Sequence, residues 1–376
     1  MTEQSAERSG EQETVAAGVR RPLAAWQELA AAVLEGAGVP APAARTVAAV
    51  VVESEARGIE SHGLRMLPGY VTRLRSGGTN PLAAPEVVRQ GPAVALLDGQ
   101  NGLGQLVAVH GMRLAMEKAR AAGIGACAAF NSNHYGAAAP YALMAARAGL
   151  IGVATTNSVA AVAPPGGRVG RVSNTATAYA VPTADEPPLT LDISMATAAR
   201  SRFILQAERG QPLPEGWAID AEGQPTTDAR AGLGGYLLPL GSPTAGHKGF
   251  GLAMLMDTLA GVLSGARFGI ELQRLTDDDP TPYGIGQFYL AVDPVWFGDP
   301  AVFRQRMDRM IRDVRATPAQ PGVERIYAPG ERAHARWLAA QRDGVAVPAA
   351  VVRRLDALAG TAAAAPPAEP ASRRST

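Results

Sequence analysis

Apolar residues recur along this chain with two different periods. Over residues 43–57, Val47, Val50 and Val51 fall on one face of a helix, as the 3.6-residue period of an amphipathic helix requires. Residues 124–130 form a short continuous apolar run, which is typical of a buried strand. Because segments of both kinds follow one another through the chain, we predict an α/β fold with a mixed sheet.

The same two patterns give the other elements. The predicted helices are Trp26–Ala37, Ala43–Arg57, a third with the stripe Leu64, Leu67, Val71 and Leu74, and then Leu106–Ala121, Ala137–Ala148, Met195–Gln206, Gly246–Gly265 and Phe303–Val314. The predicted strands are Ala93–Leu97, Ile124–Phe130, Leu150–Thr156, Thr175–Val181, Leu189–Asp192 and Gln287–Val292.

Composition changes at both ends of the chain. Residues 1–20 are rich in Glu, Ser, Gly and Gln, and residues 361–376 in Ala, Pro, Ser and Arg, so we expect both segments to be disordered. No clear linker splits the remaining residues, 21–360, and we predict a single catalytic unit. It comprises a helical N-terminal part, a central part that holds the ligands and a C-terminal part that packs back on the first, over residues 21–80, 81–270 and 271–360.

Charge and residue usage exclude several classes of function. The formal net charge is +1 and no long basic block is present, so we expect no nucleic-acid partner. There is no run of about 18 apolar residues and no signal-peptide pattern, so we expect no membrane span and a cytoplasmic protein. The single cysteine, Cys127, excludes a disulfide scaffold, and no HxxxH or HExxH spacing occurs, so we predict no metal.

The most informative motif is Asn131–Gly136, which places His134 on a small polar loop. The loop joins the apolar run 124–130 to an alanine-rich helical segment, so it lies at the carboxyl end of a strand, where α/β sheets bind ligands. Free N–H groups at the start of the helix favour an anion there, and a histidine exchanges protons near neutral pH. The motif therefore predicts an enzyme acting on a small anionic molecule; the alternative is a surface histidine without a role.

A second polar motif, Ser61-His62-Gly63, lies between two predicted helices. An arginine close by, Arg65, could hold a carboxylate through two hydrogen bonds. The alternatives need no chemistry, since Ser61 could simply cap the next helix and Arg65 could be solvated.

A third motif, Gly246-His247-Lys248-Gly249-Phe250-Gly251, combines glycines, a lysine and a helix start. Such a combination favours an anion, although it is not a Walker loop. The alternative is a glycine-rich start of a helix with a surface lysine.

Two further patterns carry less weight. Gly102-Leu103-Gly104 begins like a dinucleotide fingerprint but lacks the third glycine, so a standard Rossmann domain is not predicted. Asp277–Asp279, before Pro280, is most simply a solvated turn.

Taken together, the separated motifs resemble the type-2 malate/L-lactate dehydrogenase family, with its ureidoglycolate, sulfolactate and Δ1-piperideine-2-carboxylate oxidoreductase relatives. The resemblance extends from about residue 24 to about residue 358. The stretches that carry it are Gly58–Tyr70, Asn131–Gly136, Gly216–Asp220, Pro225–Asp228, Gly246–Leu252, Gly286–Phe288 and Pro329–Glu331.

The resemblance implies the fold of that family, in homodimers with active sites near the subunit interface. It implies hydride transfer between NAD or NADP and a small anionic substrate, a 2-hydroxy, 2-oxo or cyclic 2-imino acid. His134 would be the acid/base, Ser61 and His62 would line the reacting centre, Arg65 would belong to the catalytic set and Tyr70 would close the pocket. The implied cofactor contacts are Gly136, Ala137, Ser158, Asp192, Ile193, Ser194, Lys248 and Gly249.

Three departures from the family pattern keep other functions open. Met66 stands where the family often has its substrate-holding arginine, and residues 173–176 and 192–195 differ from the usual sequences. One alternative is a non-redox acid/base enzyme on the same scaffold, catalysing a cyclisation, tautomerisation or elimination in a specialised biosynthetic pathway. Another is a catalytically silent ligand-binding protein.

Overall fold

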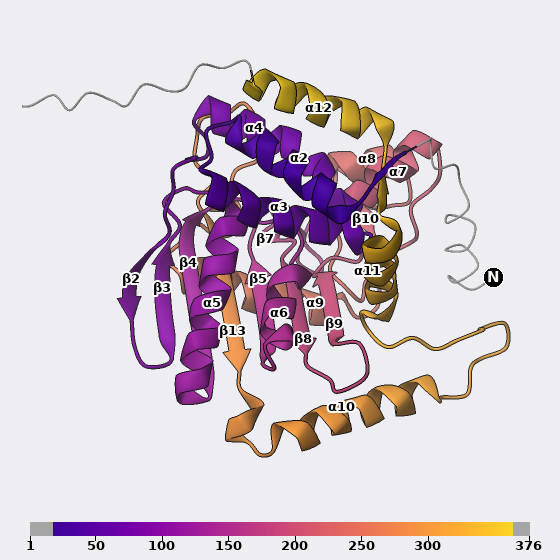
Figure 1. Ribbon diagram of the computed structural model, residues 1–376. Coiled ribbons are helices and arrows are strands. Elements are labelled where there is room, and N and C mark those ends of the chain that lie inside the picture. The colour runs from indigo at the N-terminus through magenta and orange to yellow at the C-terminus, as the bar shows by residue number, and fades with distance from the viewer. Residues whose placement is uncertain (1–17, 364–376) are drawn as a thin grey trace, which may run out of the picture.

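The fold is built around a seven-stranded sheet, seen from its helix-covered face in Figure 1. The computed structural model describes residues 18–363. The strand order is β2 (Glu86–Gln90), β3 (Val94–Asp98), β4 (Ile124–Ser132), β13 (Ile285–Val292), β5 (Ile151–Thr156), β8 (Ala176–Val181) and β9 (Leu189–Ser194). Only β3 and β4 are parallel, and all other neighbours are antiparallel. The predicted mixed sheet is confirmed.

Helices cover one face of this sheet at close range. They are α5 (Gly104–Ala122) and α6 (Ala139–Arg147). Gly111 allows this approach, because a Cβ there would lie 2.6 Å from the ring of Tyr289 on β13. The core between helices and sheet holds buried tyrosines, Tyr135, Tyr141 and Tyr289, with alanine filling the space between them.

A layer of helices lies across the upper end of the sheet in Figure 1. It contains α2 (Leu23–Glu35), α3 (Ala41–Ala56) and α4 (Leu67–Ser76), joined by the C-terminal α12 (Ala349–Ala363). The preceding helix, α11 (Glu331–Asp343), contacts α3 and runs down beside the sheet. The two ends of the described chain meet here, since β1 (Val19–Arg21) pairs with β14 (Val345–Val347) and the Trp26 indole donates to the Val345 carbonyl at 3.0 Å.

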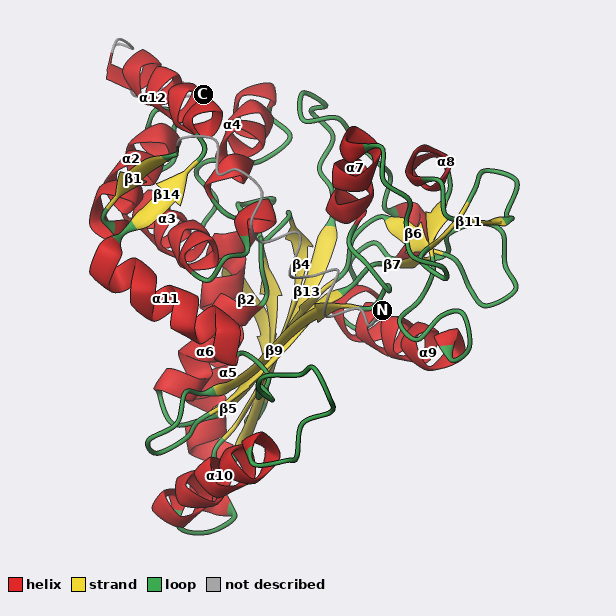
Figure 2. Ribbon diagram, turned by 90° about the vertical axis from the view of Figure 1, so that its right-hand side faces the viewer, coloured by secondary structure: helices red, strands yellow, loops and turns green. Residues whose placement is uncertain are grey.

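Smaller elements occupy the opposite face of the sheet and its lower end (Figure 2). A second sheet has the order β11 (Pro225–Thr226), β10 (Ala218–Ile219), β12 (Tyr236–Leu237), β6 (Ala160–Val162) and β7 (Val172–Ser173). The remaining helices are α7 (Arg200–Arg209), α8 (Ala229–Gly234), α9 (Gly246–Asp257) with the π-helical turn Thr258–Val262, and α10 (Pro300–Arg315). Short 3-10 turns complete the structure at Glu60–His62, Leu64–Met66, Gly269–Glu271 and Pro294–Trp296.

Some predicted elements differ from the observed ones. The helix predicted over Met195–Gln206 begins only at Arg200, because the Met195 and Thr197 N–H groups donate to the carbonyls of Thr175 and Leu238. The predicted helix Gly246–Gly265 leaves the α conformation after Asp257.

The termini extend further in ordered form than predicted. Residues 19–20 of the predicted N-terminal extension belong to β1, and residues 361–363 of the predicted tail belong to α12. The rest of both segments, residues 1–17 and 364–376, lies outside the described residues. Within the described part, no helix is long and apolar enough to cross a membrane.

Candidate active site

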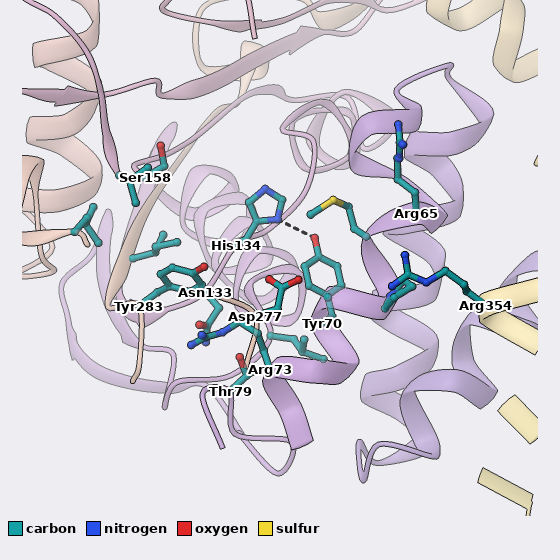
Figure 3. Close-up of a pocket in the computed structure, with 17 residues that line it drawn as sticks. Arg65, Tyr70, Arg73, Thr79, Asn133, His134, Ser158, Asp277, Tyr283 and Arg354 are labelled. Carbon is teal, nitrogen blue, oxygen red and sulfur yellow. Dashed lines mark hydrogen bonds between the residues drawn. The ribbon is translucent and has the colours of Figure 1, made fainter. Parts of the chain in front are cut away.

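A cavity of about 360 Å³ lies between α4 and the upper end of the central sheet (Figure 3). The segments that follow β4 and β5 and precede β13 all reach it, so residues far apart in sequence meet there. Its apolar wall is formed by side chains that include Met66, Leu103, Val159, Leu272 and Ile285. Its polar side chains include Arg65, Tyr70, Asn133, His134, Ser158, Asp277, Tyr283 and Arg354.

His134 is half-buried at the wall of this cavity, directly after β4. Its Nδ1 and the Tyr70 hydroxyl lie 2.8 Å apart, in a hydrogen bond drawn in Figure 3. Its ring stacks on that of His62, with 5.6 Å between the centroids. The preceding side-chain amide of Asn133 donates to the carbonyls of Asn101 and Gly102, which fixes the loop.

Gly104 explains how this loop can pass so close to α5. A Cβ at Gly104 would lie 2.1 Å from the Asn133 carbonyl oxygen. The second glycine of the Gly-Leu-Gly pattern therefore accommodates the chain that carries His134. The observed sheet, which is mostly antiparallel, agrees with the prediction that this pattern does not begin a standard Rossmann domain.

Burial sets the protonation states of the Tyr70–His134 pair. It lowers the pKa of His134 to about 3, with a further lowering from His62, so the imidazole is neutral at neutral pH. Burial also raises the pKa of Tyr70, which keeps the phenol protonated. When Tyr70 donates to Nδ1, the single proton of the neutral ring is on Nε2, where it is available to a ligand.

The corner Ser61-His62-Gly63 lies directly behind His134. The Ser61 Oγ is 2.8 Å from His62 Nδ1, and no side-chain capping bond is made at the start of the following helix. The structure therefore favours the interpretation of Ser61 as a partner of His62 over that of a helix cap.

Glu55 on α3 holds this corner in place. Its carboxylate accepts the Leu64 N–H at 2.8 Å, and Gly63 is required because a Cβ there would lie 2.0 Å from the same carboxylate. Burial raises the pKa of Glu55 to about 7. The corner is thus anchored by an ionisable group that the sequence motifs did not reveal.

The five residues predicted to be catalytic come together in the structure. Arg65, Tyr70 and His134 line the cavity, His62 stacks on His134, and Ser61 is bonded to His62. Arg65 is exposed at the rim, next to Met66, and both side chains line the cavity.

The residues predicted to contact a cofactor are more dispersed. Ser158 lines the cavity, while Gly136, with φ of 80°, and the buried Ala137 follow His134 in the turn to α6. The Asp192 carboxylate accepts the Ala139 N–H at 2.8 Å, at the first residue of α6. Burial raises the pKa of Asp192 to about 6.

The other predicted cofactor contacts lie outside the cavity wall. Ile193 and Ser194 end β9, half-buried, and Lys248 is exposed at the start of α9. Gly249 has a packing role, because a Cβ there would lie 2.3 Å from the Leu240 carbonyl oxygen.

Sequence motifs missed several residues that line the cavity, among them Arg73, Asp277, Tyr283 and Arg354. Arg73 lies three residues after Tyr70 on α4, and this spacing puts both on one face of the helix. The spacing is therefore a sequence signal that could have identified Arg73 as a residue of the site. The interpretation of Asp277 as part of a solvated turn is incomplete, since this exposed residue also forms part of the cavity wall.

Within residues 18–363 there is no group of three or more His, Cys, Asp or Glu side chains that could hold a metal ion.

The sequence of the whole chain shows which protein family this site belongs to. The sequence model described as malate/L-lactate dehydrogenase matches residues 22–356. This chain belongs to the malate/L-lactate dehydrogenase family. The resemblance inferred from the separated motifs is confirmed.

Relatives within this family act on different acids. The malate dehydrogenase of Pyrococcus horikoshii is 39% identical over 304 residues, covering 80% of this chain and 83% of that protein. The ureidoglycolate dehydrogenase (NAD(+)) of Escherichia coli is 32% identical over 311 residues, covering 83% and 87%. The (2R)-3-sulfolactate dehydrogenase (NADP(+)) of Chromohalobacter salexigens is 34% identical over 334 residues, covering 89% and 96%.

Solved structures of the family have the same fold. The malate dehydrogenase structure from Pyrococcus horikoshii superposes with a TM-score of 0.83 at 34% identity, covering 92% of this chain and 96% of that one. The Δ1-piperideine-2-carboxylate reductase structure from Pseudomonas syringae gives a TM-score of 0.82 at 29% identity, covering 90% and 99%. The predicted fold class is confirmed by these similarities.

Proposed function

We propose that this member of the malate/L-lactate dehydrogenase family is an NAD(P)-dependent oxidoreductase with His134 as its acid/base. Its substrate is a small 2-hydroxy or 2-oxo acid, or a cyclic 2-imino acid. The observation that carries the proposal is the hydrogen-bonded Tyr70–His134 pair, which lines a cavity with Arg65 at its rim. Its relatives named for NAD(+) and NADP(+) support the choice of cofactor.

The residues present fit a nicotinamide. The apolar cavity wall suits a flat ring, and its volume is in the range of about 300–1,000 Å³ that is common for small-molecule sites. Asn133 lines the cavity, and its buried Oδ1 has no hydrogen-bond partner within the described residues. The carboxamide N–H of a nicotinamide would satisfy this atom.

The start of α9 fits the phosphates of the same cofactor. No side chain caps this helix, and Lys248 is exposed in its first turn. Free N–H groups and a cation at a helix N-terminus favour an anion. Ser158 lines the cavity, and we propose that it contacts the cofactor together with Gly136, Ala137, residues 192–194, Lys248 and Gly249.

In the proposed reaction, the protein positions the acid and moves one proton. The nicotinamide, when bound, supplies the hydride that C2 of the substrate receives. Arg65 holds the substrate carboxylate, and the imidazolium form of His134, which the bound anion favours, gives one proton to the oxygen or nitrogen on C2. This step leaves the neutral imidazole and gives the 2-hydroxy or 2-amino acid. In the opposite direction the neutral imidazole takes this proton back. A positioned acid of this kind accelerates a reaction by about 10²–10⁴-fold.

The experiment is a fluorescence titration of the purified protein with NADH and NADPH, followed by assays of cofactor oxidation with a panel of 2-oxo and cyclic 2-imino acids. We expect saturable binding of at least one nucleotide and its oxidation with at least one acid. A protein that binds neither nucleotide and oxidises neither with any acid of the panel would contradict the proposal.

A further inference from the structure

One carboxylate in the cavity wall, that of Asp277, has no partner. Within residues 18–363 it makes no hydrogen bond or ion pair, although Arg65 and Arg354 line the same cavity. The two neighbouring aspartates differ from it. Asp278 does not line the cavity, and the Asp279 carboxylate is occupied by the Thr281 N–H at 2.8 Å.

Arg73 on α4 fixes the loop that carries Asp277. Its side chain is only 5% exposed, and its guanidinium donates to the carbonyls of Thr276, Asp279 and Thr281 in this loop and to that of Gly78. It also lies 4.3 Å from the centroid of the Tyr283 ring. Because its two terminal nitrogens are committed to carbonyls on both sides of Asp277, Arg73 holds the loop and makes no bond to the Asp277 carboxylate.

Gly69 brings the Asp277 carboxylate close to the proposed reacting groups. A Cβ at Gly69 would lie 2.9 Å from the Asp277 Oδ2, so any larger residue would displace this carboxylate. Gly69 directly precedes Tyr70, the partner of His134, and Figure 3 shows the Asp277 carboxylate directed into the same space as these two rings. An unpaired anion on a loop that Arg73 fixes therefore stands beside the site where C2 would react.

We propose that Asp277 selects substrates whose side chain carries a positively charged nitrogen. The inference rests on the proposed function and deepens it, since Arg65 would take the carboxylate at C1 and Asp277 the cation at the other end of the substrate. A charge-assisted hydrogen bond to a carboxylate is stronger than a neutral one, and a second carboxylate on the substrate would be repelled.

The test compares three 2-oxo acids of similar length that differ in terminal charge. They are 2-oxo-5-guanidinopentanoate, which is cationic there, 2-oxohexanoate, which is neutral, and 2-oxohexanedioate, which is anionic. We expect the wild type to reduce the cationic acid with a kcat/KM at least tenfold above that for the neutral acid. Asp277→Asn is expected to bring this ratio close to one, and Asp277→Lys to favour the anionic acid.

Asp278→Asn is the matched control, because it removes the adjacent exposed charge and should leave the ratio unchanged. A wild type that prefers the anionic acid, or an Asp277→Asn variant that keeps the wild-type ratio, would overturn the inference. If none of the three acids is reduced, that result counts against the proposed function. Calorimetric binding of the guanidino acid then decides the inference, with at least tenfold weaker binding to Asp277→Asn expected and equal binding contradicting it.

Discussion

At the residue scale, the chemistry depends on a neutral imidazole held by a phenol. Burial lowers the pKa of His134 and raises that of Tyr70, so the bond between them joins two uncharged groups at neutral pH. The resting pair therefore holds no buried charge, and the imidazole is charged only while it carries the proton that is transferred.

Tyr70→Phe removes the hydroxyl partner of His134 Nδ1 and leaves the rest of the side chain in place. We expect kcat to fall about tenfold, since a hydrogen bond that orients the acid is worth about 1–2 kcal/mol. Steady-state kinetics with the preferred acid would measure this. Tyr179→Phe on β8 is the control, and equal kcat values for the two variants would contradict the assigned role of Tyr70.

Glu55 gives a prediction about pH and stability. Burial raises its folded pKa to about 7, above the unfolded value of 4.5, so its contribution to stability is fully present below pH 4.5 and is lost as the pH rises to 7. His134 changes the free energy of unfolding in the opposite direction with pH, because its pKa is lowered in the folded protein. The difference in unfolding free energy between wild type and Glu55→Gln isolates the pH-dependent contribution of Glu55. This contribution changes by up to about 3 kcal/mol.

The measurement is denaturant unfolding of both proteins at pH 5 and pH 8. We expect the wild type to lose stability relative to Glu55→Gln over this interval. A constant difference between the two proteins would mean that Glu55 does not titrate in this range.

At the element scale, the loop over residues 276–283 is attached to α4 by one side chain. Arg73 reaches carbonyls of this loop and of Gly78, which a helix-face pattern alone does not reveal. Because the bonds from Arg73 to the loop join residues about 200 positions apart, local sequence periodicity could not predict them. The same reason explains Met195–Ala199, whose helical pattern gave way to backbone bonds with Thr175 and Leu238.

Arg73→Ala should loosen this loop. It leaves several carbonyls unpaired, so we expect the unfolding free energy to fall by about 3 kcal/mol and KM to rise. Arg75→Ala, two residues later and exposed, should change stability by no more than about 0.5 kcal/mol. Urea unfolding and kinetics of both variants measure the difference, and an equal effect of the two would show that Arg73 does not hold the loop.

At the scale of the whole molecule, motifs and long-range contacts were predictable to different degrees. The Ser61–Gly63 and Asn131–Gly136 motifs marked the two histidines, and the family resemblance placed them in one site, as the stacked rings show. The anchoring of Ser61–Gly63 by Glu55 and the placement of Asp277 depend on packing between distant elements, and neither has a local signature.

We also propose that two copies of this chain associate through α9 and the segment after it. Apolar side chains are exposed there, 50% for Leu255, 58% for Leu263 and 66% for Ile270, and contiguous apolar surface marks interaction sites. Light scattering should give twice the chain mass of 38.8 kDa, and Leu263→Asp should shift the protein towards that single mass. A wild type that is monomeric at micromolar concentration would contradict this proposal.

The most direct measurement is kcat/KM for reduction of the preferred acid by His134→Ala, with cofactor binding measured in parallel. If His134 supplies the proton, kcat/KM should fall by at least about 10²-fold while NAD(P)H binds as before. If His134→Ala retains activity within a few-fold of wild type, the imidazole at the centre of this account is not the acid.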